Sequence, residues 1–178
     1  AIHAANDGCL ELRQIHGTDH SASERVELGI HPMVLELTGK RAPHTGLEGK
    51  FSVYHAAVVA LARGAASEAE FSDEAVRDGA VVSLRDRVQA NVDLFVKSYL
   101  EARVKILLRD GTVLERHVPH ALGTLARPMS DSDLEAKFRG LVAPVLTPGR
   151  VDELIELCWK MEHVADVGAI ARAACPSA

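Results

Sequence analysis

Residues 49–57 read Gly49-Lys50-Phe51-Ser52-Val53-Tyr54-His55-Ala56-Ala57 and open an apolar segment that is typical of a helix. Large side chains recur here at intervals of three and four, which places on one helical stripe Phe51, Tyr54, Val58 and Leu61. A cation, a phenol and an imidazole, from Lys50, Tyr54 and His55, lie at or beside this stripe. The first turn of a helix also has free N–H donors and the positive end of its dipole, so the region suits an anion. By itself the pattern leaves two interpretations open, a functional site or a core tyrosine whose hydroxyl has found a partner.

The bulk composition is that of an ordinary soluble globular protein. The chain has 178 residues, of which 47% are hydrophobic and 25% are charged. Because only 4% are aromatic, the core is expected to consist mainly of Ala, Val, Leu and Ile. The formal net charge of -5 argues against a nucleic-acid surface, and no apolar run is long enough to span a membrane. We therefore expect neither a nucleic-acid partner nor a membrane.

Cysteine and histidine spacing gives no metal-binding pattern. Cys9, Cys158 and Cys175 are far apart and show neither a disulfide framework nor zinc-ligand spacing. Free thiols are typical of a reducing compartment, which predicts a cytoplasmic protein. His117 and His120 come closest to ligand spacing, but no third ligand lies near them in the sequence, so we expect no metal site.

Alternating apolar residues predict four strands, at about 25–31, 88–94, 104–108 and 112–118. Asp110-Gly111 predicts a two-residue hairpin turn of type I′ between the last two strands. The short run 33–37 fits either a strand or a helical turn, and the segment 39–49 reads as a loop because it contains Pro43 and glycines.

Helical periodicity fills most of the remaining chain. Helices are predicted at about 2–16, 51–63, 72–85, 130–145, 151–161 and 167–174, with Gly64 ending the second of them. In the helix from 130, a buried stripe is expected from Leu134, Phe138, Leu141 and Val145. The sequence thus predicts one α+β domain over residues 1–178. It should contain a small, mostly antiparallel four-stranded sheet packed by five or six helices.

A second block of sequence points to a family. It reads Gly123-Thr124-Leu125-Ala126-Arg127-Pro128-Met129-Ser130 and continues to Leu134 and Lys137-Phe138. Together with Lys50-Phe51-Ser52, Tyr54, Gly64 and Asp110-Gly111, in this order, it resembles the second domain of the MmgE/PrpD family. That family includes 2-methylcitrate dehydratases, cis-aconitate decarboxylases and an iminodisuccinate epimerase. The resemblance covers nearly the whole chain.

The start of the chain also resembles a family motif, in which a lysine and a Pro-x-x-x-x-(Thr)-His run precede a helix. On this match His3 is the motif histidine, and the lysine that precedes it in the motif is lost from this chain. The family has a large helical first domain, of which nothing is present in this sequence. The resemblance therefore implies the C-terminal α+β domain of a longer enzyme, with its N-terminal helical domain absent. It also implies a site between the two domains, so we expect the isolated chain to bind polycarboxylate poorly and to turn nothing over.

The chemistry that the family requires assigns roles to three residues. Its members remove or add a proton next to a carboxylate of a small di- or tricarboxylate, without a cofactor. Such a reaction needs a base, and it needs cations or donors where negative charge develops. The resemblance makes Tyr54 the catalytic residue, while Lys50 and His3 are of the right type to bind substrate. No cofactor and no metal are expected.

Several functions remain open. The leading one is a lyase that resembles 2-methylcitrate dehydratase, and the alternatives are a polycarboxylate epimerase or decarboxylase of the same family. A further alternative is a non-catalytic interaction or dimerisation domain, whose sign would be a large bare apolar patch. A homo-oligomer is expected. His55 is expected to be a packing or helix-surface residue, and Arg127 either faces the cleft or pairs with an acid.

Overall fold

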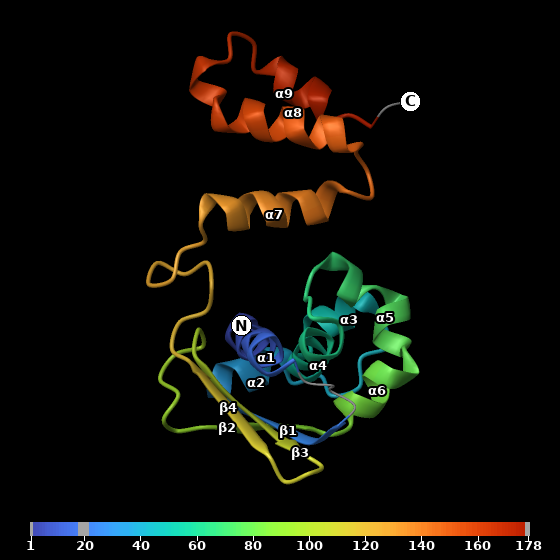
Figure 1. Ribbon diagram of the computed structural model, residues 1–178, viewed down its shortest axis with the longest axis vertical. Coiled ribbons are helices and arrows are strands. Elements are labelled where there is room, and N and C mark those ends of the chain that lie inside the picture. The colour runs from blue at the N-terminus through green and yellow to red at the C-terminus, as the bar shows by residue number, and fades with distance from the viewer. Residues whose placement is uncertain (1, 18–21, 177–178) are drawn as a thin grey trace. The chain divides into compact units, whose positions relative to one another are not determined.

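The structure is a computed structural model that describes residues 2–17 and 22–176. The chain divides into two compact units, residues 1–128 and residues 129–178. The first unit contains the sheet and helices α1 to α6, and the second contains α7 to α9 (Figure 1).

A four-stranded sheet in the order β2-β1-β3-β4 is the base of the first unit. The strands are β1 (Ser23–Ile30), β2 (Val88–Val92), β3 (Ala102–Leu108) and β4 (Val113–Val118). The pairs β1–β3 and β3–β4 are antiparallel, whereas β1 and β2 are parallel. A parallel pair needs a long crossover, which the helices between β1 and β2 provide. The predicted α+β class with a mostly antiparallel sheet is confirmed.

The first unit has more helices than the sequence predicted. They are α1 (His3–His16), α2 (Pro32–Thr38), α3 (Gly46–Lys50), α4 (Val53–Arg63), α5 (Asp73–Arg77) and α6 (Gly79–Arg85), with a 3₁₀ turn at Glu68–Phe71. The predicted loop 39–49 was wrong at its end, because Thr45 caps α3 by accepting a hydrogen bond from the Glu48 N–H. The predicted helix 72–85 is two helices, because the Asp78 side chain caps a second start at Gly79. These short extra helices raise the total in the described residues to nine, above the predicted five or six.

Helix α4 is the central element of this unit. Its residues Val53 to Leu61 are all buried, as expected for a helix that is apolar on every side. The predicted one-sided stripe was wrong for Phe51, which precedes the helix and is 56% exposed. Ser52 begins the helix by accepting a hydrogen bond from the His55 N–H, and Gly64 ends it at φ 70°. Helix α1 packs beside α4 and over β3 and β4, and both helices are seen nearly end-on in Figure 1.

The hairpin between β3 and β4 differs from the predicted type I′ turn. Type I′ requires positive φ at both central residues. Gly111 has φ 86°, but no residue other than glycine has positive φ in the described chain, so Asp110 does not meet the requirement. The loop is longer, with the Leu108 N–H bonded to the Thr112 carbonyl at 2.8 Å, and the Asp110 carboxylate accepts from the Thr112 N–H at 2.8 Å. Asp110 therefore stabilises the turn through its side chain.

The sheet has one covered and one open face. Residues that point to the helices are buried, such as Val26, Leu28, Val104 and Ile106. On the open face, Glu27 lies opposite Lys105, which lies opposite Glu115 and pairs with it at 3.4 Å. A shallow hollow of about 710 Å³ lies over this face. Alternation of burial along the strands thus places charge on one side of the sheet and the core on the other.

The second unit consists of α7 (Asp131–Val142), α8 (Pro148–Trp159) and α9 (Gly168–Ala173), with a 3₁₀ turn at Met161–His163. Its buried core is small and contains Leu146, Val151, Leu154 and Ala173. The predicted buried stripe of α7 was wrong, because α7 has no buried residue. Leu134, Leu141 and Val145 are 44%, 48% and 58% exposed, and a groove of about 240 Å³ lies between α7 and α8.

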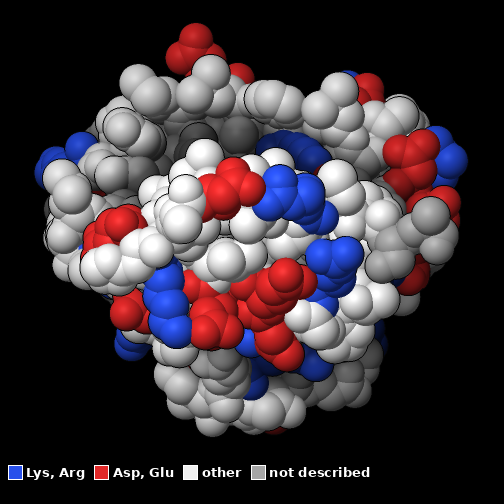
Figure 2. Space-filling model, turned by 90° about the horizontal axis from the view of Figure 1, so that it is seen from above, with Lys and Arg blue, Asp and Glu red and all other residues white. Residues whose placement is uncertain are grey.

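No helix in residues 2–17 and 22–176 is long and apolar enough to cross a bilayer. On the face of the molecule in Figure 2, Lys and Arg side chains lie among Asp and Glu side chains. Opposite charges are thus interspersed on this face, in a chain whose formal net charge is -5.

Candidate functional site

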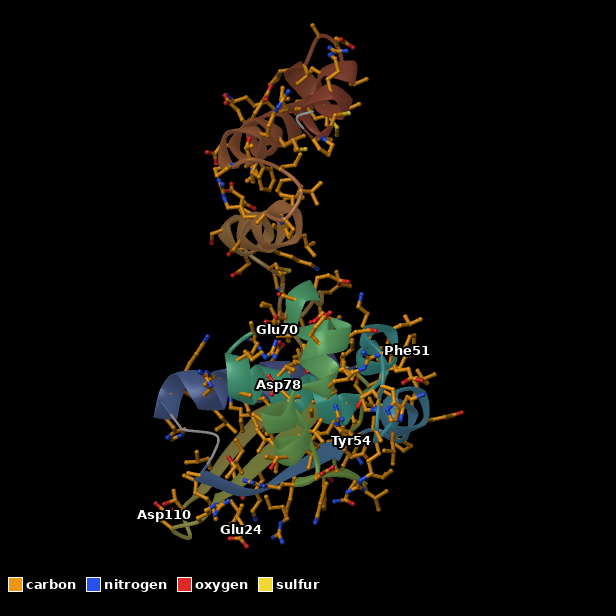
Figure 3. The ribbon with its side chains drawn as sticks, turned by 90° about the vertical axis from the view of Figure 1, so that its right-hand side faces the viewer. Glu24, Phe51, Tyr54, Glu70, Asp78 and Asp110 are labelled. Atoms are coloured by element: carbon orange, nitrogen blue, oxygen red, sulfur yellow. The ribbon has the colours of Figure 1, made fainter. Side chains whose placement is uncertain are left out.

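Tyr54 lies in the first turn of α4, with its ring in the core. The residue is 5% exposed and belongs to the main hydrophobic cluster. Among the described residues, the Tyr54 hydroxyl has no hydrogen-bond partner. Figure 3 shows Tyr54 within the first unit, with Phe51 nearer its edge.

The guanidinium group of Arg41 covers one side of this ring. Its central carbon lies 5.3 Å from the centroid of the Tyr54 ring, a cation–π distance. One of its terminal nitrogens donates to the Val88 carbonyl at 3.5 Å. The candidate catalytic phenol thus has a cation as its immediate neighbour, which the sequence did not indicate.

Lys50 lies at the C-terminal end of α3 and is already paired. Its Nζ lies 2.6 Å from Oε1 of Glu68, and the two side chains are 41% and 66% exposed. An exposed pair of this kind contributes little to stability and opens readily. A substrate carboxylate at Lys50 would have to compete with Glu68.

His3 is the first residue of α1 and is exposed. At the far ends of α1 and α4, Arg13 donates to the carbonyls of Leu61 and Ala62. Because the C-terminal ends of the two packed helices meet there, their N-terminal ends share the opposite side of the unit. His3 and Tyr54 therefore lie at the same end of the helical layer, where two helix dipoles have their positive ends.

An ion-pair network that the sequence analysis missed follows His3 along α1. Asp7 and Glu11 lie four and eight residues after His3, on the same helical face. Arg127 pairs with both, at 3.7 Å to Asp7 and 2.8 Å to Glu11, and Glu11 also pairs with Arg116. Arg127 thus pairs with acids, which is one of the two expectations for it. The signal available in the sequence was the spacing of four between His3, Asp7 and Glu11.

Asp7 has a raised pKa within this network. Burial raises the pKa of Asp7, although the Leu122 N–H, which donates to it at 2.6 Å, and Arg127 both lower it. His3 also lowers the pKa of Asp7 by its charge, so the two side chains interact. The network connects the segment around Leu122 and Arg127 to the start of α1, and so brings together two sequence blocks that are more than a hundred residues apart.

His55, beside Tyr54 in the sequence, is a packing residue. It is completely buried, its Nε2 lies 2.8 Å from the Glu70 carbonyl, and its ring meets Phe71 edge-on. Arg85, also buried, donates from Nη1 to the Val76 carbonyl at 3.1 Å and lies 3.5 Å from His55 Nδ1. Since an arginine only donates, Nδ1 accepts and Nε2 holds the proton. Burial lowers the pKa of His55, and the charge of Arg85 lowers it further.

The histidines and cysteines do not gather into a metal site in the part of the chain that the structure describes. There, no group of three or more His, Cys, Asp or Glu could hold a metal ion. His117 instead lies 2.8 Å from Oε1 of Glu101. Cys9 is buried, which raises the pKa of its thiol, whereas Cys158 and Cys175 are exposed.

Comparison with known proteins agrees with this arrangement of motifs. The family model of the MmgE/PrpD C-terminal domain matches residues 1–161, across the boundary between the two units. Mouse (Mus musculus) cis-aconitate decarboxylase is 26% identical over 165 residues, which is 90% of this chain and 33% of that protein. The chain therefore spans about a third of the length of this relative. By the match over residues 1–161, this chain belongs to the MmgE/PrpD family and contains its C-terminal domain.

Proposed function

We propose that this chain forms one wall of the active site of a cofactor-independent enzyme that acts on small polycarboxylates. The first candidate reaction is the dehydration of a 2-methylcitrate-like substrate. The observation that carries the proposal is that Tyr54, at the start of a buried helix, has a cation over its ring, while its hydroxyl has no hydrogen-bond partner among the described residues. A core tyrosine of purely structural role would more commonly have its hydroxyl bonded within the protein.

The proposed roles follow from the charge that the reaction creates. Removal of a proton next to a carboxylate places further negative charge on a substrate that is already anionic, so donors and cations must lie where it develops. Tyr54 would donate a hydrogen bond to the substrate or relay a proton. His3, at the same end of the unit as Tyr54, would bind a carboxylate. Lys50, four residues before Tyr54, would bind another once its pair with Glu68 has opened.

A second, helical domain is proposed to supply the opposite wall and the main acid and base. The chain spans only a third of the length of its mouse relative, so a relative of that length has room for such a domain. The isolated chain should then turn nothing over. We propose further that the complete protein is a cytoplasmic homo-oligomer.

Replacement of Tyr54 in a two-domain protein tests the catalytic role. The protein would join this chain to a helical domain of the same family, and it would be assayed with 2-methylcitrate, cis-aconitate and iminodisuccinate. For Tyr54→Phe we expect kcat to fall by about 10²–10³, the usual effect of losing one well-placed donor, with little loss of stability. Tyr99→Phe is the matched control, since Tyr99 is 46% exposed and far from α4 in sequence.

The reverse result would reject the proposal. A Tyr54→Phe protein with normal turnover and reduced stability would make Tyr54 a structural residue. The substrate that is consumed also distinguishes dehydratase, decarboxylase and epimerase, because only the first of these releases water and only the second releases carbon dioxide.

Exposed apolar residues in the second unit favour interaction with another domain or a second copy as an additional candidate function. Trp159 and Met161 are 51% and 58% exposed, and α7 leaves its apolar face bare around the groove to α8. Patches of this kind mark docking surfaces. Light scattering of the isolated chain tests this candidate: self-association that Leu141→Ser reduces would support it, and a monomer at all concentrations would oppose self-association.

A further inference from the structure

Three cationic side chains lie close to the candidate site in sequence or in space, and they differ in the groups with which they pair. Lys40 pairs with Glu48 at 2.5 Å, and Lys50 pairs with Glu68 at 2.6 Å. Arg41, by contrast, has no carboxylate within ion-pair distance among residues 2–17 and 22–176. Its only hydrogen bond there goes to the Val88 carbonyl and is long, at 3.5 Å. The guanidinium of Arg41 thus still has N–H donors that could bind an anion.

The position of this arginine is fixed by the ring beneath it. The guanidinium lies 5.3 Å from the centroid of the Tyr54 ring, and Tyr54 is buried in the main hydrophobic cluster. Stacking on an aromatic face orients the planar group and leaves its edge free to bind an anion. Because the ring covers one face of the guanidinium, an anion at its edge is also less screened by water on that side.

We propose that Arg41 is a substrate-binding residue, which pairs through its guanidinium edge with one carboxylate of a small polycarboxylate while the Tyr54 hydroxyl faces the same molecule. The proposal rests on the proposed function and names a residue that the comparison of motifs did not indicate. A guanidinium binds a carboxylate through two parallel N–H···O bonds, which fixes orientation as well as charge. Arg41 needs no such bond to be broken first, whereas Lys50 must leave Glu68. Of the two, Arg41 is the stronger carboxylate ligand.

Citrate serves as the probe, because it presents three carboxylates and can be titrated against this chain without turnover. We would follow the Arg41 Nε–H and the Tyr54 backbone N–H by NMR, at up to about 50 mM citrate, a concentration that still reveals millimolar affinity. Arg41→Ala should weaken citrate binding by about tenfold or more, the usual effect of losing a hydrogen-bonded charge. Arg41→Lys keeps the charge but loses the paired donors, so it should restore only part of the affinity.

Lys40→Ala is the matched control, since it removes the neighbouring positive charge that Glu48 already neutralises. It should change the affinity by less than about twofold. Equal weakening by Lys40→Ala and Arg41→Ala would mean that citrate senses only net charge, and would overturn the proposal. Unchanged affinity in Arg41→Ala would overturn it too. So would an absence of any shift at Arg41 and Tyr54 in the unaltered chain.

This test and the turnover test of Tyr54→Phe can fail separately. Loss of citrate binding in Arg41→Ala with normal turnover in Tyr54→Phe would support the carboxylate site at Arg41 and reject the catalytic role of Tyr54. Normal citrate binding in Arg41→Ala with loss of turnover in Tyr54→Phe would do the opposite.

Discussion

Helices α4 and α7 both have apolar residues at helical intervals, but α4 is apolar on every side whereas α7 is apolar on one side only, and their burial is opposite. Helix α4 buries every residue from Val53 to Leu61, whereas α7 buries none, although Leu134, Phe138 and Leu141 recur at helical intervals. The difference lies in what surrounds each helix. Helix α4 contacts α1, α2, α3, α6 and β2, while α7 has its main contact with α8. Apolar spacing therefore identifies the side chains that need cover, and only tertiary packing decides whether they receive it.

The sharpest way to break this comparison is to place a charge on each helix. Val58→Asp would put a carboxylate in a fully buried site, and we expect it to lower the free energy of unfolding of the first unit by more than about 4 kcal/mol. Leu134→Asp would put one on a side chain that is 44% exposed, and should change the second unit by less than about 0.5 kcal/mol. Denaturation in urea would be followed by circular dichroism for both units.

Fluorescence separates the two units, because the single Trp, Trp159, lies in the second. Val58→Asp should therefore remove secondary structure while leaving the Trp159 transition in place. If Leu134→Asp were as damaging as Val58→Asp, the face of α7 would be covered in solution and the contrast would be wrong.

The buried His55 gives the next largest effect. His55→Ala would remove a buried ring and leave the Glu70 carbonyl and Arg85 without their partner, at a cost of about 3 kcal/mol. Because the pKa of His55 is lowered in the folded protein, its contribution is fully present above the unfolded value of about 6.5 and is lost as the pH falls.

Urea midpoints between neutral and mildly acidic pH check this sign. The unaltered chain should lose stability as the pH falls, and part of that slope should be missing in His55→Ala. His163→Ala is the control, since that ring is 77% exposed and lies in the second unit. An identical slope in His55→Ala would show that the imidazole is not the group that titrates.

Two glycine substitutions test the same contrast, because an added methyl group should destabilise the tightly packed first unit and stabilise the open helix α7. A Cβ on Gly46 would meet the Phe71 carbonyl oxygen at 1.9 Å, so Gly46→Ala should cost the first unit about 1–3 kcal/mol. A Cβ on Gly140, inside α7, would meet nothing within 4 Å. Gly140→Ala should therefore stabilise the second unit by about 0.5–1 kcal/mol through helix propensity. Thermal unfolding of both variants measures the two shifts, and destabilisation by Gly140→Ala would show that α7 is packed on that side.

Local chemistry made much of the fold predictable. Alternation located the four strands, and the helices predicted from 72 and from 130 do begin there, where the side chains of Ser72 and Ser130 cap them. What failed depended on neighbours distant in sequence. Phe51 fits the helical spacing, but Ser52 begins the helix after it, so its ring stays outside. For the candidate site, the sequence indicated Tyr54 but not the Arg41 guanidinium over its ring, because a cation stacked across a loop leaves no periodic signal.

The smallest predicted effect concerns the ion pairs behind His3. Arg127→Ala would leave Asp7 with the Leu122 N–H and Glu11 with Arg116, and both acids are mostly buried, at 15% and 17% side-chain exposure. We expect a loss of about 0.5–1 kcal/mol, the upper part of the range for such pairs, because Arg127 itself is 40% exposed. Lys160→Ala is the control, since its pair with Glu156 is 63% and 67% exposed and should contribute almost nothing. Urea titrations at low and high salt measure the difference, which salt should reduce. Equal and negligible losses in the two variants would show that Arg127 does not hold its segment to α1, and that other contacts, such as the Leu122 N–H with Asp7, keep them together.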